Sequence, residues 1–404
     1  MAYSPSHPPV RHAAAFQRRL LAALAAVAAV GTPLSHAAAA PPAGATAPSN
    51  ALEQAVRLAD WQLERMAAAP VSRATSDTNN TRAWEQAAFW VGMTALADAG
   101  GPPRVGEAII AMGQANGWRP GEKTYFADDH AITQAYLWAA RNGAGRAATA
   151  PTRETFDQVV GKPAVTTLAF YVPPEGYHAA ECLNRWCWCD ALFMAPAALI
   201  ELSRQTGDPR YRDFALKEFW ATTDFLYDPV ERLYYRDSRF FERRDEQGRK
   251  MFWSRGNGWV FAGLARIIPL LPEGDPDRSR LEALFVEMAG RLSQLQKPDG
   301  YWAPSLLAPE DSPPESSGTA FYTYGIAWGI DAGLLPRDEY EPVARRGWSA
   351  LLQAIQPDGR LGWVQQVSDR PEKVEANETQ FYGVGAFLLA ATAVARLDAP
   401  TRGK

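Results

Sequence analysis

Asp190 is the acidic residue whose surroundings most suggest chemistry. It lies between Trp188 and the apolar run 191–194, so its carboxyl enters a packed helical face where an isolated charge is costly to bury. Such a carboxyl is paired, caps a helix, or has a shifted pKa suited to proton transfer. The motif by itself favours helix capping and catalysis equally.

A second acidic motif is Asp128-Asp129-His130. Paired carboxyls across a sugar-binding site are usual in glycoside chemistry, where one is held protonated and the other ionised. The alternative is that one aspartate caps a helix and the other is exposed to solvent. A histidine beside two acids more often orients groups by hydrogen bonding than acts as a base, and we treat His130 as a binding candidate.

Further polar and aromatic residues stand where helices are expected to begin. Aromatic rings suit the apolar faces of sugars, whereas Ser, Thr, Asn and Asp there are ordinary helix caps. Capping does not explain Arg255, His130 or Trp259. The candidates for substrate binding are His130, Trp84, Trp188, Trp253, Arg255, Asn257, Trp259, Ser317 and Thr319.

Helical periodicity recurs along the chain, and strand signals are scarce. About twelve helical segments are expected, and they form consecutive pairs. In order they are 51–68 and 84–99, 104–116 and 128–141, 153–160 and 188–205, 209–227 and 257–271, 277–296 and 318–332, 337–356 and 379–397.

The loops between these segments alternate in length. Links from one pair to the next are mostly short, and links inside a pair are mostly long and rich in Pro, Gly and Asp. The second helix of each pair is apolar nearly all round, which is typical of a helix buried on all faces. The pattern predicts an all-α, closed (α/α)6 toroid with the second helices inside; an open α-solenoid is the alternative. The starts of the inner helices would then converge at one end, which favours an anionic ligand.

Composition narrows the class of protein. The chain has 404 residues, with 14 tryptophans and 14 tyrosines. Its net charge of −4 gives no indication of a nucleic-acid partner. A basic segment with Arg18 and Arg19, the apolar run 20–30 and small residues at 35–40 predict a signal peptide over 1–40. After the signal peptide we expect a flexible linker over 41–50 and then a single catalytic domain over 51–398. We expect a periplasmic or secreted protein that has no membrane association once the signal peptide is removed.

Three cysteines, Cys182, Cys187 and Cys189, precede Asp190. In an oxidising compartment Cys182 could bridge to Cys187 or Cys189, and free buried thiols are an equal alternative. The spacing fits no standard zinc site. We expect no metal and no organic cofactor.

Four motifs in unbroken order resemble glycoside hydrolase family 105, whose fold and chemistry are shared by family 88. They are Asp128-Asp-His-Ala-Ile132, Trp188-Cys-Asp-Ala-Leu-Phe-Met194, Phe252-Trp-Ser-Arg-Gly-Asn-Gly-Trp-Val260 and Glu315-Ser-Ser-Gly-Thr-Ala-Phe-Tyr-Thr-Tyr-Gly325. The resemblance covers most of the chain, from about Trp84 to Tyr382.

The resemblance implies a six-hairpin unsaturated uronyl hydrolase, which removes a 4,5-unsaturated uronic acid from the non-reducing end of oligosaccharides made by polysaccharide lyases. In such enzymes a carboxyl protonates C4 of the vinyl ether and water adds at C5. Asp190 matches the proton donor, and Asp128 or Asp129 matches the second acid. Arg255 would anchor the uronate carboxylate bidentately, and Trp253 and Trp259 would face the sugar.

One departure concerns the loop 228–256, which lacks the histidine found in well-known members and offers Tyr234-Tyr-Arg-Asp-Ser-Arg239 instead. We expect Arg236, Asp237 and Arg239 to pin this loop through surface ion pairs rather than to bind substrate. An ordinary glycosidase or lyase on the same fold, and a non-catalytic oligosaccharide-binding protein, are the alternative functions. Neither the choice between galacturonide and glucuronide nor the oligomeric state follows from the sequence.

Overall fold

The computed structural model describes residues 50–66, 79–161 and 167–399. Its α-helices are α2 (Asn50–Glu64), α3 (Trp84–Asp98), α4 (Pro103–Ala115), α5 (Ala127–His130), α6 (Thr133–Ala139), α7 (Ala150–Gly161), α8 (Ala191–Met194), α9 (Pro196–Thr206), α10 (Pro209–Leu226), α11 (Ser254–Ile267), α12 (Pro276–Gln294), α13 (Ser316–Asp331), α14 (Arg337–Gln353) and α15 (Phe381–Asp398). Short helical turns lie at Ala140–Ala144, Arg146–Thr149, Tyr177–Ala179, Glu181–Arg185, Ser238–Phe240 and Ile268–Leu270. Strands β1 (Tyr227–Asp228) and β2 (Leu233–Tyr234) pair antiparallel.

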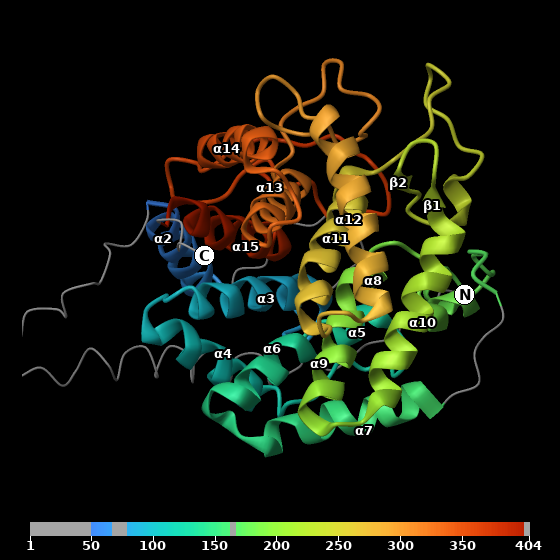
Figure 1. The fold of residues 1–404 in the computed structure, drawn as a ribbon, viewed down its shortest axis with the longest axis vertical. Helices are drawn as coiled ribbons and strands as arrows, with labels where there is room; N and C mark the ends of the chain where they lie inside the picture. Colours follow the sequence, from blue (N-terminus) through green and yellow to red (C-terminus); the bar gives the residue numbers. More distant parts are fainter. Residues whose placement is uncertain (1–49, 67–78, 162–166, 400–404) are drawn as a thin grey trace, which may run out of the picture.

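The inner helices form a closed ring. In order around it, α3 contacts α6, α6 contacts α9, α9 contacts α11, α11 contacts α13, α13 contacts α15, and α15 returns to α3 (Figure 1). The outer helices α2, α4, α10, α12 and α14 pack against members of this ring. Because the first and last inner helices touch, the fold is the expected (α/α)6 toroid and the open solenoid is excluded.

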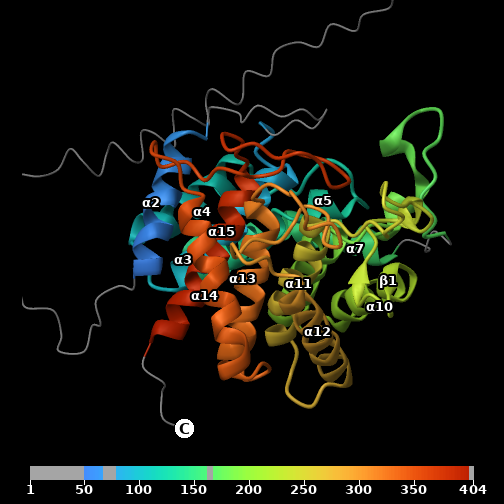
Figure 2. The ribbon, with the colours of Figure 1, turned by 90° about the horizontal axis from the view of Figure 1, so that it is seen from above.

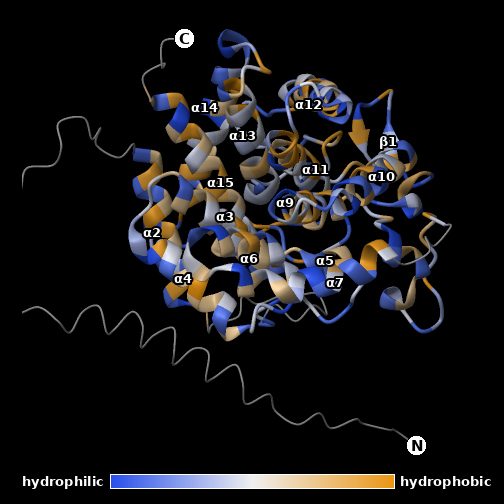
Figure 3. Cartoon of the chain, turned by 60° about the horizontal axis from the view of Figure 1, so that its bottom comes forward, coloured by the Kyte–Doolittle hydropathy of each residue, from blue (hydrophilic) through white to orange (hydrophobic). Residues whose placement is uncertain are grey.

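Burial separates the two sets of helices as the hydrophobic pattern predicted. In α15, 15 of 18 residues are buried, whereas the outer helix α12 buries 6 of 19. Figure 3 shows the same contrast, with hydrophobic colouring over α15 and mixed colouring on α12. An inner helix therefore has polar side chains mainly at its ends, where they meet loops or solvent.

Two inner helices are broken near their N-terminal ends. The segment expected over 128–141 is divided into α5 and α6, and the segment expected over 188–205 is divided into α8 and α9. Pro196 opens α9 and cannot donate a backbone hydrogen bond into α8, which explains the second break. Asp128 lies in α5 and Asp190 directly precedes α8, so both breaks occur beside the candidate acids.

The long connections gather at one end of the ring. Figure 2 shows the segments before α13 and α15 along the same edge as α5. The connections before α11 and α13 are joined there by a backbone bridge between Trp253 and Ser305, and a bridge between Ile355 and Leu361 lies within the connection before α15. This end of the ring, called the loop end below, is where the helix starts converge.

The expected signal peptide (1–40) and linker (41–50) lie outside the described residues, apart from Asn50. Within the described ranges, α15 is the one helix whose length and composition would allow it to cross a membrane, but 83% of that window is buried inside the ring. Its apolar character is that of an inner helix.

The contact that closes the ring depends on glycine. A Cβ atom on Gly92 in α3 would overlap the carbonyl oxygen of Gly385 in α15, and a Cβ on Gly385 would overlap the carbonyl oxygen of Ala88. The two backbones approach so closely because neither position carries a side chain.

Gly92→Ala is therefore expected to lower the free energy of unfolding by about 1–3 kcal/mol, because the added methyl group forces α3 and α15 apart. Urea denaturation measures this loss. Gly290→Ala in the outer helix α12 is the matched control, since its nearest neighbour would be the Tyr340 hydroxyl at 3.7 Å. The control should change stability little or raise it by up to about 1 kcal/mol. Equal losses in both variants would contradict the closure argument.

Candidate active site

Asp190 precedes α8 at the loop end, but its side chain makes no capping hydrogen bond to that helix. Its Oδ2 lies 3.4 Å from the Sγ of Cys189, which donates a hydrogen bond, and 3.4 Å from Nε of Arg236. The residue is 8% exposed, and its side chain is nearly enclosed but keeps 11% of its surface accessible to solvent. The geometry argues against the capping alternative and leaves the carboxyl available for chemistry.

Asp128 comes from α5, which packs directly against α8. Its Oδ1 is buried and has no hydrogen-bond partner. Burial raises the pKa of Asp128 well above its usual range, and the charge of Asp190 raises it further. Burial also raises the pKa of Asp190, while Arg236 and Arg255 act in the opposite direction. Two coupled carboxyls of this kind share protons as a pair.

Asp129 faces away from this pair and organises the preceding loop. Its Oδ2 accepts a hydrogen bond from the backbone N–H of Lys123, and its backbone carbonyl accepts one from Gly121. A Cβ on Gly121 would overlap the Asp129 side chain, so the loop packs tightly on it. Of the two aspartates left open by the sequence, Asp128 is the one coupled to Asp190.

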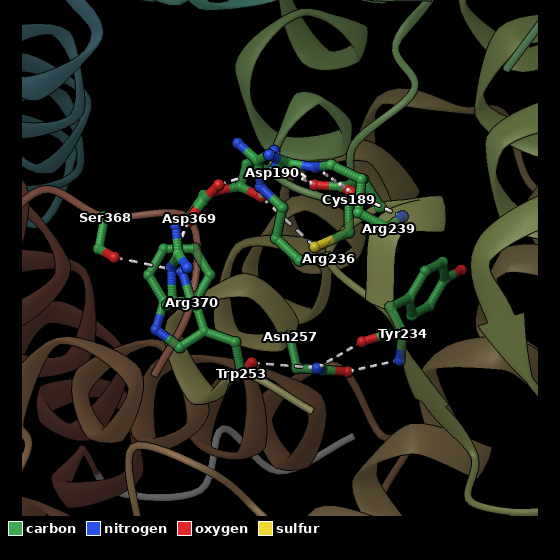
Figure 4. A network of polar contacts seen from close by, with 11 residues as sticks. Cys189, Asp190, Tyr234, Arg236, Arg239, Trp253, Asn257, Ser368, Asp369 and Arg370 are labelled. Carbon is green, nitrogen blue, oxygen red and sulfur yellow. Dashed lines mark hydrogen bonds and ion pairs between the residues drawn. The ribbon is translucent and has the colours of Figure 1, made fainter. Parts of the chain in front are cut away.

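The loop after β2 places Arg236 beside Asp190. The backbone carbonyl of Arg236 accepts a hydrogen bond from Cys189 at 2.9 Å, and its Nη1 donates to Asp237 at 2.8 Å. Arg236 is 7% exposed and Asp237 is fully buried. The expectation of surface ion pairs was therefore wrong for Arg236 and Asp237, because both are buried, and Arg236 lies beside Cys189 and Asp190 (Figure 4).

Arg255 occupies a different place from the one its motif suggested. It is fully buried, and its Nη1 and Nη2 donate to the backbone carbonyls of Gln365 and Gln366 at 2.7 and 3.0 Å. The guanidinium lies between the rings of Trp253 and Tyr382, at 4.4 and 4.7 Å from their centroids. This placement favours a role in holding the connection before α15 over direct binding of a carboxylate.

Trp253 and Asn257 also connect segments. Trp253 is buried, and its indole N–H donates to Gln365 at 3.0 Å. The Asn257 side chain accepts from the Tyr234 N–H at 2.7 Å and donates to the Tyr234 carbonyl at 2.9 Å, so it ties β2 to α11 (Figure 4). Both side chains build the site without presenting a surface to a sugar.

The remaining tryptophans differ in exposure. Trp84 is partly exposed and stacks on Tyr382 with centroids 5.1 Å apart. Trp259 is fully buried against Phe321 at 4.4 Å, and Trp188 is buried in a stack with Phe126. Among the tryptophan candidates, Trp84 is the one placed to offer part of its ring to a ligand.

Three further candidates are buried. Ser317 hydrogen-bonds Glu315, which caps α13, and Thr319 accepts from the backbone N–H of Trp302 at 3.1 Å. His130 lies on Phe156, and its Nε2 donates to the Thr124 carbonyl at 2.8 Å, since a carbonyl can only accept. These placements favour structural roles.

Cys182 and Cys187 form a disulfide with a Cα–Cα separation of 5.5 Å, whereas Cys189 is a free, buried thiol. The disulfide closes the turn that leads into Asp190. Over the ranges that the structure describes, no group of three or more His, Cys, Asp or Glu side chains is placed to hold a metal ion.

Sequence reasoning found Asp190 and the Asp128-Asp129 motif, but it did not find the side chains around them. Arg236, Asp237 and Asp369 come from loops without periodicity, and Asp369 approaches Asp237 only through Arg239, which contacts both. The absence of the expected histidine in the loop 228–256 was the one signal that pointed there.

Comparisons with known proteins agree with one another. A family model described as Glycosyl Hydrolase Family 88 matches residues 54–398. An unsaturated 3S-rhamnoglycuronyl hydrolase from Alteromonas sp. (strain LOR) is 41% identical over 321 residues, covering 78% of each chain. A relative of the same name from Formosa agariphila is 36% identical over 324 residues, covering 78% of this chain and 85% of the relative.

Solved structures show the same fold. A family 88 glycosyl hydrolase from Bacteroides vulgatus has 28% identity and a TM-score of 0.74, covering 87% of this chain and 99% of that one. A polysaccharide lyase has 28% identity and a TM-score of 0.73 with the same coverage.

The buried His130 predicts a pH dependence of stability. Burial lowers its pKa from 6.5 to about 4, so on acidification the unfolded chain takes up a proton before the folded protein does. The folded protein should lose stability as the pH falls from about 6.5 to 4, by up to about 3 kcal/mol from this residue. Urea denaturation of wild type and His130→Gln at pH 7 and pH 4 measures the difference. Identical losses in both proteins would contradict the prediction.

Proposed function

The chain belongs to glycosyl hydrolase family 88, and from this membership we propose that it releases a 4,5-unsaturated uronic acid from the non-reducing end of lyase-generated oligosaccharides. The resemblance to family 105 noted in the motifs is consistent with this assignment, because the two families share their fold and chemistry. The enzyme is a glycoside hydrolase of the unsaturated uronyl type.

The acid pair is the observation that supports this chemistry. Asp128 and Asp190 come from adjacent broken helices, and the pKa of each is raised by burial. A raised pKa makes a carboxyl easier to protonate, and a protonated carboxyl can act as a general acid. The pair combines that acid with a second carboxyl that can be ionised, as general acid–base chemistry requires.

In the proposed reaction Asp190 protonates C4 of the vinyl ether, and the electron pair of the C4–C5 double bond forms the new C–H bond. The resulting positive charge is shared by C5 and the ring oxygen. Asp190, now a carboxylate, takes a proton from a water molecule as the water oxygen bonds to C5. The hemiketal opens to a ketone at C5, and the hemiacetal at C1 then releases the remaining saccharide. Asp128 is the second acid, and it stabilises these reaction steps.

The names of the two relatives guide the substrate proposal. Both describe an unsaturated glycuronyl unit joined to rhamnose. We propose a glycuronyl-rhamnose oligosaccharide of the ulvan type as the substrate, and lyase products of pectin and arabinogalactan as the comparison set. The anionic uronate suits the loop end, where inner-helix starts and buried arginines lie. We also propose export by the N-terminal signal peptide, which sequencing of the mature N-terminus tests.

A polysaccharide lyase is the second candidate, because one similar structure carries that name. The two activities have opposite optical signatures. A hydrolase of this type removes the ultraviolet absorbance of the vinyl ether, whereas a lyase creates it. An increase of that absorbance on an intact polysaccharide would favour the lyase and contradict the proposed function.

Matched aspartate substitutions test the site. Asp190→Asn and Asp128→Asn should each lower kcat by about 10²–10⁴-fold, because the amide can neither donate the carboxyl proton nor accept one from water. Asp129→Asn should retain most activity, since an amide oxygen can still accept the hydrogen bond from the Lys123 N–H. Loss of vinyl-ether absorbance reports the rate, and thermal unfolding reports stability. Activity retained in Asp190→Asn, or lost in Asp129→Asn but not Asp128→Asn, would refute the assignment.

A further inference from the structure

Arg236 is held unequally by the two carboxylates that flank it. Its Nη1 donates to Asp237 Oδ2 at 2.8 Å, but its Nε approaches Asp190 Oδ2 only to 3.4 Å and has no hydrogen-bond partner. Asp237 also accepts three hydrogen bonds from Arg239, two from the guanidinium at 2.8 and 2.7 Å and one from the backbone N–H at 3.0 Å. Asp190 is therefore the carboxylate that Arg236 can give up while Asp237 stays satisfied.

Arg236 belongs to an arginine–aspartate cluster that is balanced in charge. Arg239 reaches Asp369 at 2.8 Å, and Arg370 contacts the other oxygen of Asp369 at 2.8 Å (Figure 4). The cluster consists of Arg236, Arg239, Arg370, Asp190, Asp237 and Asp369. With Asp190 ionised its charges cancel; with Asp190 protonated one positive charge is left over. A single carboxylate ligand restores the balance.

From this arrangement we propose that Arg236 binds the uronate carboxylate of the substrate, and that the substrate takes the place of Asp190 as its partner so that Asp190 becomes protonated. The inference rests on the proposed function and adds the residue that recognises the acid group. It connects recognition to catalysis, because the general acid acquires its proton only when an anionic substrate is present.

Accessibility distinguishes Arg236 from Arg255. Asp190 and Arg236 keep 8% and 7% of their surface exposed, so a ligand can touch both. Arg255 has no exposed surface, and two of its nitrogens already donate to backbone carbonyls. Arg236 is also the cation that directly contacts the acid, which makes an exchange of partners possible.

The groups around Asp190 come from several elements, and their charges decide the direction of the effect. They are Asp128 from α5 with Glu85 of α3 beyond it, Cys189 on the same loop, Arg255 from α11, and Arg236 with its neighbours Tyr177, Asp237 and Arg239. The arginines lower the pKa of Asp190, whereas burial raises it. A uronate that occupies Arg236 adds a negative charge and weakens the main opposing cation, so the pKa of Asp190 rises further.

A substrate pair separates this role from general structural damage. Wild type should prefer the free unsaturated uronate to its methyl ester by about 100-fold in kcat/KM, since the ester lacks the charge that pairs with a guanidinium. In Arg236→Gln the preference should fall to within about threefold, whereas misfolding would lower both rates equally and leave the ratio unchanged. An unchanged ratio in an Arg236→Gln protein whose thermal unfolding matches that of wild type would overturn the proposal.

Arg236→Lys keeps the positive charge and serves if the glutamine variant does not fold. Lysine lacks the forked geometry of arginine, so KM should rise while the preference for the free acid remains. Loss of that preference in Arg236→Lys would count against the proposal, because in the proposed site the positive charge, rather than the forked guanidinium, selects the free acid over its ester.

Proton uptake tests the exchange in the unmodified enzyme. A saturated glucuronyl-rhamnose disaccharide has no double bond to hydrate, and its binding can be followed by calorimetry in two buffers of different ionisation enthalpy. Wild type at pH 7 should take up close to one proton per ligand, and Asp190→Asn should take up almost none. Binding without uptake in wild type would overturn the inference. If wild type consumes no unsaturated oligosaccharide, the proposed function fails; turnover with an unaltered acid-to-ester ratio in Arg236→Gln refutes only the role of Arg236.

Discussion

The closure of the inner ring is the constraint on which the rest of the structure depends. When α15 meets α3, each inner helix is surrounded by other helices, and its length must be apolar. Polar side chains are then confined to helix ends, where backbone groups and loops can satisfy them. A functional site in this fold therefore forms at an end of the ring, and the long connections determine which end. That closure requires the backbones at Gly92 and Gly385 to approach so closely that neither position can carry a side chain.

Breaks in two inner helices bring the carboxyls of the acid pair into this environment. A continuous helix would carry its first turn out of the ring, but α5 and α8 are single turns that pack against each other before the chain turns into α6 and α9. The carboxyls of Asp128 and Asp190 are consequently held in a setting where ionisation of both is unfavourable. Burial supplies the raised pKa values, and the nearby arginines make the two acids unequal. Two residues of the same type can then take different roles.

The arginines show how a motif and its geometry can diverge. Arg255 stands in one of the four motifs that resemble the family, yet its guanidinium supports the backbone at Gln365 and Gln366 between two aromatic rings. Arg236 stands in a loop that departs from the family pattern, yet it touches the candidate acid. Buried arginines of both kinds are expensive to desolvate, and each is stabilised by partners supplied from distant loops. The way the loops fold over one another determines which partner each arginine has.

Much of the fold was determined by local sequence. The apolar periodicity of the second helices and the alternation of loop lengths predicted the toroid and its loop end, and the acidic motifs at helix starts predicted that Asp190 pairs with either Asp128 or Asp129, because each pattern depends on residues close together in the chain. Tertiary structure alone decided which neighbouring aspartate faces Asp190, why Asn257 and His130 are buried, and that Arg236 lies inside rather than on the surface. These outcomes depend on contacts such as Arg239 with Asp369, 130 residues apart in the chain, whose geometry no local pattern encodes. The sequence therefore identified the acids, and the packing of the loops identified their partners.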